Sequence, residues 1–427
     1  MGRIKPMLLM GFNSPTLSGG NRRVFEILRR AKSEGIDYVI VTDRQSCYNA
    51  SRMLPDSLRL LSHFRTYVAS FDWSSQKLSR IPGLDQLLAY RDILVLSLSA
   101  SKIALRENVD LIVGFEDNKT LLTSYLTGKL SGKPWTAVFQ ASKPLFQPSS
   151  SIGSLNPLNI LKFVGQEDSA KNLPFLSKIG LSTQVLEVLR VAENSLMLSV
   201  SGTVVEELKH LNPKIRFHVI EPANGIDLEE FATNSDTKQE YDALFFARLV
   251  PEKGLYELPA IWKNVTEEIP EALLGVAGIT EDQRYVNQFL EMISKLRLSR
   301  NIVFLGEYRQ NALMNLIRSS RLTLNPTHYD SFSLVTLESL ACGTPVVAYD
   351  IAAIRHNFGK CDAVIRCPVK DRKSMAQKAI SIIQDENLRA MLSEKATEYS
   401  ANYDWNDVVR AEKEAYYKVI ARSKKGR

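Results

Sequence analysis

The sequence contains few of the residues that cross-link a protein or bind a metal. Its 427 residues include four cysteines and five histidines, and the cysteines show no Cys-x2-Cys spacing. Four scattered thiols are too sparse for a disulfide framework, and the histidines form no ligand-spaced cluster. The chain also has no Asp-x-Asp triplet, which could clamp a metal and a diphosphate together. We therefore predict reduced structural thiols and no metal site.

Long apolar runs are absent as well. No stretch reaches the eighteen apolar residues of a membrane span, and the residues after Met1 lead directly into a strand-like run rather than a signal peptide. Apolar and charged contents of 44% and 24% are typical of a soluble globular protein. We predict a cytoplasmic location, with the inner face of the membrane as a second expectation.

The net charge of +7 and the pI near 9.0 would suit nucleic acid, anionic lipid or phosphorylated substrates. The basic residues are dispersed, however, and no nucleic-acid-binding motif occurs. We therefore predict no nucleic-acid partner and attribute most of the charge to a solvated surface.

Strand-like and helix-like patterns alternate twice along the chain, which predicts two doubly wound α/β lobes. The first series starts with a buried strand at residues 6–10, then a loop ending in Gly19-Gly20 and a helix. The second starts with a strand at residues 243–246, after a polar stretch without an apolar period. Residues 144–185 are the least legible part; they fit an acceptor-binding loop, a membrane-touching loop or a partly buried insertion.

The most informative stretch is residues 325–347, which reads as strand end, loop, short helix, turn and strand. It contains two carboxylates, Asp330 and Glu338, eight residues apart. A helix that began at Asp330 would place both on one stripe, separated by roughly 12 Å. Ser331 or Ser333 is suited to cap this helix, and its first N-H groups would bind an anion such as diphosphate. An amphipathic helix with two solvated acids remains the alternative.

The pattern Asp330-x7-Glu338 followed by Ala-Cys-Gly-Thr-Pro-Val-Val resembles the Glu-x7-Glu signature of the retaining GT-B glycosyltransferases of family 4, also called group 1 glycosyltransferases. A second element, Arg248-Leu-Val-Pro-Glu-Lys253-Gly, is similar to the family's Gly-Arg-Leu-x-x-x-Lys-Gly, with Ala247 replacing the first Gly. The resemblance covers most of the chain and is strongest over residues 243–348.

The resemblance implies a GT-B fold, with two Rossmann-like doubly wound lobes facing a central cleft. It places an acceptor-side lobe at residues 1–228, a linker at 229–241, a donor-nucleotide lobe at 242–403, and a helix at 404–427 that crosses back to the first lobe. Arg248 and Lys253 would stabilise the leaving diphosphate. Glu338 would hold the ribose, and Asp330 the donor sugar. The remaining substrate-binding positions implied are Gly19, Gly20, Ser331, Phe332, Ser333, Leu334 and Val335.

Three further positions, besides Ala247, depart from the family pattern. Gln140 stands where a His is common, Asp330 replaces Glu, and Ser333 replaces Gly. Because Asp is one methylene shorter, its carboxylate is pulled back by roughly 1.5 Å, and we expect a changed donor-sugar preference. His328 lies close to Asp330 and suits either a ligand contact or a structural role.

We therefore predict a metal-independent, retaining glycosyltransferase of the hexosyltransferase type. Its co-substrate would be a nucleoside-diphosphate sugar, with no cofactor, and its partner an acceptor glycan, either lipid-linked or a small molecule. A peripheral membrane contact would accompany a lipid-linked acceptor. Two alternatives stay open: a non-catalytic nucleotide-sugar-binding partner protein, and a sugar-nucleotide epimerase of the same fold.

Overall fold

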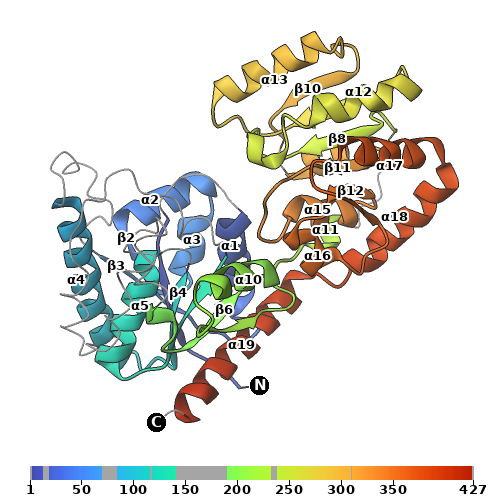
Figure 1. Cartoon of the computed structure of the whole chain (residues 1–427). Coiled ribbons are helices and arrows are strands. Elements are labelled where there is room, and N and C mark those ends of the chain that lie inside the picture. Colours follow the sequence, from blue (N-terminus) through green and yellow to red (C-terminus); the bar gives the residue numbers. More distant parts are fainter. Residues whose placement is uncertain are drawn as a thin grey trace. The chain divides into compact units, whose positions relative to one another are not determined.

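The computed structural model describes residues 2–12, 19–69, 84–115, 118–140, 190–231, 238–308 and 310–425. These residues form two compact units, one of residues 1–223 with 405–427 and the other of residues 224–404 (Figure 1). The whole 144–185 segment, for which an acceptor-binding loop, a membrane-touching loop or a partly buried insertion was predicted, lies outside the described residues. No described helix is both long and apolar enough to cross a membrane.

The first unit is built on one parallel sheet of seven strands in the order β3-β2-β1-β4-β5-β6-β7. The strands are β1 (Pro6–Met10), β2 (Val39–Asp43), β3 (Arg65–Ala69), β4 (Leu111–Phe115), β5 (Trp135–Phe139), β6 (Leu196–Ser199) and β7 (Arg216–Val219). The helices are α1 (Gly19–Ala31), α2 (Arg44–Met53), α3 (Ser57–Ser62), α4 (Leu84–Arg106), α5 (Asn118–Ser131), α10 (Gly202–Leu211) and α19 (Trp405–Lys425).

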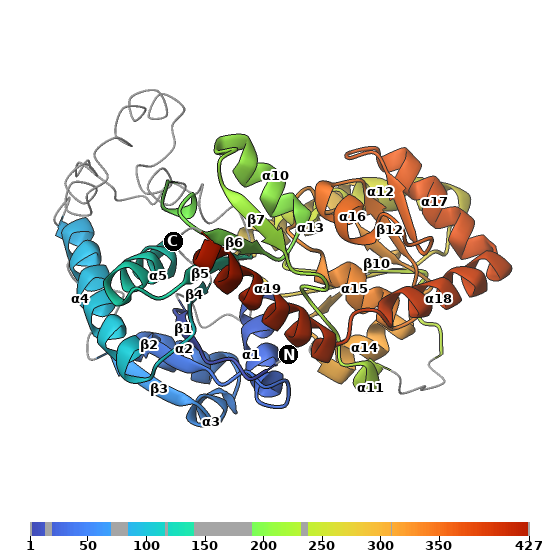
Figure 2. The same ribbon diagram turned by 90° about the horizontal axis from the view of Figure 1, so that it is seen from below.

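Both faces of this sheet are covered, which explains the continuous apolar run of β1. Leu8 and Met10 pack into one buried cluster with α1 and α19, whereas Met7 and Leu9 pack into another with α4 and α5. The layers on the two faces can be followed in Figure 2. The terminal helix α19 therefore belongs to the core of the first unit.

The α1–α19 contact contains a buried ion pair. Arg23 and Glu412 have fully buried side chains, and the guanidinium donates to the Glu412 carboxylate and to the carbonyl oxygen of Ala223 at 2.5 Å. The hydroxyls of Tyr38 and Tyr416 are 3.0 Å apart in the same layer, and burial raises the pKa of both phenols. These polar contacts fix the register of α19 on the first unit.

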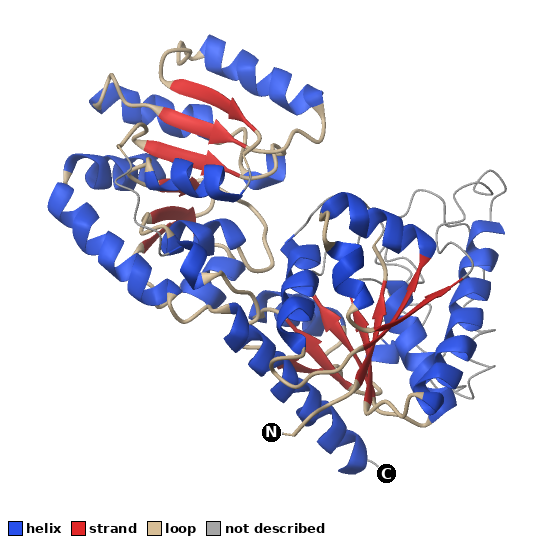
Figure 3. Cartoon of the chain, turned by 180° about the vertical axis from the view of Figure 1, so that it is seen from behind, coloured by secondary structure: helices blue, strands red, loops and turns tan. Residues whose placement is uncertain are grey.

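The second unit has six parallel strands in the order β10-β9-β8-β11-β12-β13 (Figure 3). They are β8 (Ala243–Phe246), β9 (Leu274–Ala277), β10 (Ile302–Gly306), β11 (Thr323–Asn325), β12 (Val346–Tyr349) and β13 (Val364–Cys367). The helical segments are α11 (Leu228–Phe231), the 3-10 turn η3 (Pro251–Lys253), α12 (Leu258–Glu268), α13 (Gln283–Lys295), α14 (Gln310–Arg318), α15 (Leu334–Ala341), α16 (Ala352–Phe358), α17 (Arg372–Gln384) and α18 (Glu386–Ser400).

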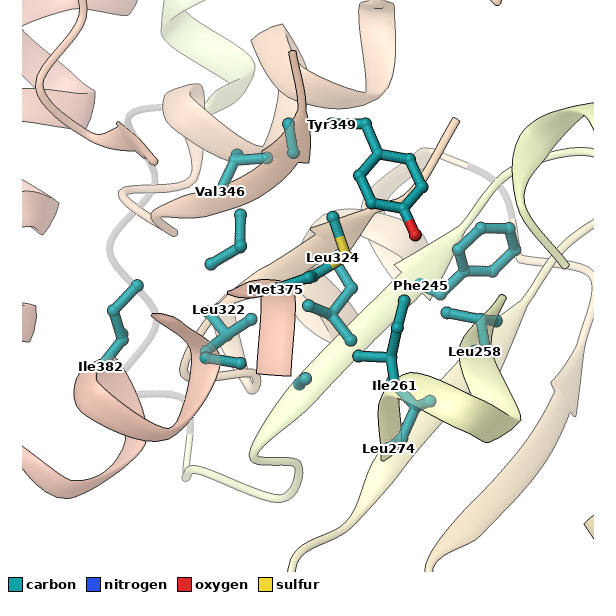
Figure 4. Close-up of a cluster of buried hydrophobic side chains, with 14 of the residues drawn as sticks. Phe245, Leu258, Ile261, Leu274, Leu322, Leu324, Val346, Tyr349, Met375 and Ile382 are labelled. Carbon is teal, nitrogen blue, oxygen red and sulfur yellow. The ribbon is translucent and has the colours of Figure 1, made fainter. Parts of the chain in front are cut away.

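Figure 4 shows part of the core of the second unit, where α12 packs on the sheet. Leu258 and Ile261 of α12 lie beside Phe245 of β8 and Leu274 of β9, all with at most 1% exposure. The core holds β8 and β11 in place, and these are the two strands at which the strand order reverses. All four cysteines of the chain are free.

The predicted α/β architecture with two Rossmann-like lobes is confirmed. One local prediction is wrong: Gly19 and Gly20 are not loop residues but the first two residues of α1. The helix of the central stretch begins at Leu334, so Asp330 lies just before it and Glu338 lies inside it, as predicted.

Candidate functional site

The site residues predicted in the second unit follow the strands on either side of its switch point. Arg248 and Lys253 come after β8, and Asp330 comes after β11, which pairs directly with β8. In open parallel sheets the carboxyl ends of such neighbouring strands mark the ligand-binding edge. The topology therefore brings together two motifs that are 77 residues apart in the sequence.

Hydrogen bonds and a close backbone approach hold the loop that follows β8 against the loop that follows β11. The N-H of His328 donates to the carbonyl oxygen of Glu252 at 3.0 Å, and the Thr327 hydroxyl donates to that of Lys253 at 3.4 Å. Gly254 has a φ of 86°, and a Cβ there would lie 2.2 Å from the carbonyl oxygen of Pro326. Glycine is required at this position by both the left-handed backbone and the close approach.

Lys253 and Asp330 form an ion pair at the centre of this arrangement. The Nζ of Lys253 donates to Oδ2 of Asp330 at 2.8 Å and to the carbonyl oxygen of Tyr329 at 3.4 Å. The side chains are only 15% and 22% exposed. The partial burial strengthens the attraction between the two charges, and the contact holds the ammonium of Lys253 beside the carboxylate of Asp330. Oδ1 of Asp330 accepts from the N-H of Ser331 at 2.9 Å, which fixes the carboxylate.

The entry into α15 differs from the predicted capping. Ser333 is the residue before the helix, but its side chain makes no cap hydrogen bond. Its hydroxyl instead lies 3.0 Å from Nδ2 of Asn325 and 2.9 Å from the hydroxyl of Thr336. Its φ of 76° is left-handed, a conformation that favours glycine. Ser333 therefore combines a strained backbone with a buried polar network.

The other predicted positions around α15 divide into buried and accessible ones. Phe332 is 5% exposed, and its ring packs edge-on against Phe358 with centroids 5.6 Å apart. The side chains of Phe332 and Ser333 therefore face the core, so only their backbone is left for a ligand. Leu334, Val335 and Glu338 are half-buried. At the start of α15 the N-H of Thr336 donates to the carbonyl oxygen of Ser333 at 3.1 Å, which leaves the N-H groups before it suited to an anion.

Arg248 is not part of the Lys253–Asp330 pair. Its Nη1 donates to both carboxylate oxygens of Glu281, at 3.0 and 3.2 Å, and the two side chains are 46% and 41% exposed. The predicted positions Gly19 and Gly20 lie in the first unit, half-buried in the first turn of α1. Gln140 follows β5 and is also half-buried.

A second polar cluster, which no sequence motif indicates, lies next to this loop and is centred on Glu257. This residue is 7% exposed and accepts from the Tyr349 hydroxyl at 3.1 Å and from Nε of Arg372 at 2.6 Å. Nε2 of His328 lies 3.4 Å from it. Burial acts to raise the pKa of the Glu257 carboxyl, but Arg372, Tyr349 and His328 outweigh it and lower the pKa below its ordinary value.

The Glu257 cluster packs against the loop that carries Asp330. The His328 ring lies against Tyr349, with centroids 5.8 Å apart, so the loop that carries Asp330 rests on β12. No spacing rule connects residues 257, 328, 349 and 372, so only the fold reveals the cluster. Among the described residues, no group of three or more His, Cys, Asp or Glu side chains is placed to hold a metal ion.

Comparison with known proteins finds matches for the second unit. Residues 227–399 match the family model of glycosyl transferases group 1, which confirms the resemblance predicted from the Asp330–Glu338 stretch. A phosphatidyl-myo-inositol mannosyltransferase of Mycolicibacterium smegmatis is 29% identical over 209 residues, 47% of this chain and 52% of that protein. A glycogen synthase of Mycobacterium tuberculosis is 25% identical over 241 residues, 55% of this chain and 58% of that protein. The chain thus spans little more than half the length of these curated relatives.

Solved structures extend the likeness to the whole chain. A glycosyltransferase from Rickettsia africae superposes with a TM-score of 0.69 at 17% identity, covering 98% of this chain and 99% of that one. The Anabaena protein HepE, crystallised with UDP and glucose, gives a TM-score of 0.66 at 15% identity and covers 97% and 99%. At these identities the likeness shows the fold, which is GT-B.

Proposed function

Because residues 227–399 match the family model of glycosyl transferases group 1, we propose that this protein transfers a sugar from a nucleoside-diphosphate sugar to an acceptor hydroxyl. The transfer proceeds with retention of the anomeric configuration, without a metal, and the sugar is a hexose. The observation that carries the proposal is the Lys253–Asp330 pair, fixed by the Pro326 loop at the switch point of the second unit. HepE, which shares the fold, binds UDP and UDP-glucose.

In this mechanism Lys253 and Arg248 bind the diphosphate. The bond between the anomeric carbon and the phosphate oxygen breaks, and its electron pair leaves with the phosphate. Negative charge therefore grows where the ammonium and the guanidinium lie, and their attraction is greatest in the transition state. Lys253 acts as a point charge and Arg248 as a planar fork. The N-H groups at the start of α15 add partial positive charge on the same side.

Asp330 and Glu338 orient the donor. Asp330 accepts hydrogen bonds from the sugar hydroxyls, and Glu338 from those of the ribose. The acceptor hydroxyl attacks the face from which the phosphate leaves, and the departing phosphate oxygen takes the acceptor's proton, so no separate base is needed. Gly19, Gly20 and the backbone of Ser331 to Val335 complete the contacts with the substrates.

The first experiment measures the melting temperature with UDP, GDP, ADP, CDP and dTDP, each with and without magnesium. At about 100 times Kd a ligand adds about 2.7 kcal/mol to the free energy of unfolding, which moves the melting temperature visibly. We expect a rise with one nucleotide and no dependence on magnesium. No rise with any nucleotide would contradict a donor site.

Turnover with the nucleotide sugar so identified then separates an enzyme from a non-catalytic binding protein. Lys253→Ala should remove most transfer while part of the nucleoside affinity survives. The matched control is Lys263→Ala, an exposed lysine of α12 whose partner is Glu267 at 3.5 Å. Equal transfer rates for the two variants would take Lys253 out of the mechanism, and absence of transfer by the wild type with every acceptor would favour the binding protein.

A further inference from the structure

The loop that carries Asp330 is held at two points by side chains that lie four residues apart in the sequence. Nζ of Lys253 contacts Oδ2 of Asp330 at 2.8 Å, at one end of the segment 328–330. At the other end of this segment, Nε2 of His328 faces the Glu257 carboxylate at 3.4 Å. A cation therefore holds the acidic residue of the loop, and an anion faces its imidazole.

The Glu257 carboxylate is itself firmly fixed. Glu257 immediately precedes α12, and its carboxylate accepts from Nε of Arg372 at 2.6 Å and from the Tyr349 hydroxyl at 3.1 Å. Tyr349 is fully buried in the core that Figure 4 shows. Burial acts to raise the pKa of Glu257, but the contacts with Arg372 and Tyr349 outweigh it, so the carboxylate is ionised at neutral pH. Movement of this buried anion would leave its partners unsatisfied.

The ring of His328 depends on this carboxylate for its orientation. An ionised carboxylate only accepts hydrogen bonds, so the ring nitrogen that faces it, Nε2, carries a hydrogen. The other ring nitrogen, Nδ1, is buried and has no hydrogen-bond partner in the part of the chain that the structure describes. The ring also lies against Tyr349, with centroids 5.8 Å apart, but this contact is not polar. Glu257 is therefore the side chain that sets the direction of the imidazole.

Donor binding affects the two ends of the segment differently. In the proposed transfer the ammonium of Lys253 binds the diphosphate, so it is shared between the donor and Asp330. The contacts of His328 involve no group assigned to the donor. Its ring faces Glu257, and its backbone N-H donates to the carbonyl oxygen of Glu252 at 3.0 Å. The loop therefore keeps its place through His328 when the donor engages Lys253.

We propose that Glu257 is a positioning residue for the transfer, which acts through His328 to hold the Asp330 carboxylate where the donor sugar binds. Glu257 itself touches neither substrate. The inference rests on the proposed function, in which Asp330 binds the sugar. Asp330 follows His328 by two residues, and a loop that is already ordered by buried contacts loses less conformational freedom when its ligand binds. The role concerns the sugar and not the nucleotide, because the contacts of Glu257 lead to Asp330.

The test compares binding of the nucleotide sugar with binding of the corresponding nucleoside diphosphate, which lacks the sugar. His328→Phe keeps an aromatic ring against Tyr349 and removes the Nε2 hydrogen, while Glu257 keeps its hydrogen bonds with Arg372 and Tyr349. We expect the Kd for the nucleoside diphosphate to change by less than about twofold. The Kd for the nucleotide sugar should rise about tenfold, and kcat should fall about tenfold, because the carboxylate is no longer held in place.

Two further variants test whether Glu257 acts through His328. His328→Gln places an amide N-H opposite the carboxylate and should recover most of the affinity for the nucleotide sugar. Glu257→Gln alone should weaken binding of the nucleotide sugar but not of the nucleoside diphosphate. Added to His328→Phe, it should change neither Kd further, because the two residues belong to one line of contacts. The matched control is His210→Phe, at an exposed histidine of α10, which should change neither Kd.

Equal losses of affinity for the two ligands in His328→Phe would overturn the proposal, since they would indicate a general disturbance of the second unit. Unchanged affinity for the nucleotide sugar would overturn it as well. If His328→Phe melts below the assay temperature, Glu257→Gln provides the same comparison. Failure of the proposed function would appear in the wild type, which would bind no nucleoside diphosphate and transfer no sugar, and this inference would fall with it. Failure of this inference alone appears only in the variants of a wild type that does both.

Discussion

The ammonium of Lys253 lies 2.8 Å from the carboxylate of Asp330, across two loops that the sequence separates by 77 residues. In the proposed transfer, the ammonium binds the diphosphate and the carboxylate binds the sugar. In the structure the two groups neutralise each other, so a bound donor would replace one hydrogen-bonded partner by two.

This pairing predicts opposite effects on nucleotide affinity. Asp330→Asn removes a negative charge and releases Lys253 for the diphosphate, so the affinity for the free nucleoside diphosphate should rise several-fold. Lys253→Ala should lower it, while both variants transfer sugar roughly ten- to a hundredfold more slowly. Calorimetric titration and initial rates provide the two readouts. Weaker nucleotide binding by Asp330→Asn would show that the carboxylate does not restrain Lys253.

Two substitutions of Ser333 separate the cost of its strained backbone from the stabilisation by the hydrogen bonds of its hydroxyl. Its left-handed φ of 76° costs about 1 kcal/mol for a residue with a Cβ, but its hydroxyl satisfies Asn325 and Thr336 in a buried site. Ser333→Gly relieves the strain and loses the hydroxyl, whereas Ser333→Ala loses the hydroxyl and keeps the strain. We expect Ser333→Ala to be less stable than Ser333→Gly by about 1 kcal/mol in urea unfolding. Equal stabilities would mean that the φ is not strained in solution.

The Glu257 cluster predicts a pH-dependent contribution to stability. Because the folded state lowers the pKa of Glu257, its stabilising contribution is complete above the unfolded pKa of about 4.3 and is lost as the pH falls through the folded value. Glu257→Gln should therefore cost roughly 1–2 kcal/mol at neutral pH, a value reduced by the exposure of Arg372. The difference should shrink below about pH 4.

Urea unfolding of both proteins at neutral and acidic pH measures this difference. Glu267→Gln is the control, because Glu267 is a 59% exposed residue of α12, the helix that Glu257 immediately precedes. It should change the free energy of unfolding by no more than about 0.5 kcal/mol at either pH. A constant deficit for Glu257→Gln at all pH values would assign its effect to packing rather than to charge.

The fold could be predicted from the sequence because the spacing of apolar residues and the positions of turn-forming Gly and Pro residues are local features of the chain. The buried strands at residues 6–10 and 243–246 are apolar runs, and Gly343 and Pro345 end α15 as expected. The small elements α2, α3 and β3 and the edge strand β13 were not predicted. Edge strands such as β3, whose burial is only partial, carry a weaker apolar signal.

Only the site residues that belong to sequence motifs could be predicted. The motif residues Lys253 and Asp330 were expected in one donor site, but their mutual ion pair depends on how the Gly254 turn packs against Pro326. Ser333 does not cap the helix with its side chain because its hydroxyl oxygen accepts from Nδ2 of Asn325 and its hydroxyl also bonds to that of Thr336. The Glu257 cluster joins residues up to 115 positions apart, so it follows from tertiary packing alone.

Arg248 allows the last test, because Nη1 of its guanidinium donates to both carboxylate oxygens of Glu281. If Arg248 binds the diphosphate, it must first leave this carboxylate. Glu281→Gln should therefore lower the KM for the nucleotide sugar several-fold at low salt, and the gain should fade at high salt because both side chains are exposed. Arg248→Ala should slow transfer roughly ten- to a hundredfold, and adding Glu281→Gln to it should change nothing further.

The control for Glu281→Gln is Glu291→Gln, which removes the same charge from an exposed position of α13 that pairs with Lys295. If both variants lower KM equally, the effect comes from the overall charge of the unit and not from Arg248. If only Glu281→Gln lowers it, and only while Arg248 is present, the guanidinium exchanges a carboxylate for the diphosphate. That result would link the two motifs of the second unit, since Lys253 is restrained by Asp330 in the same way.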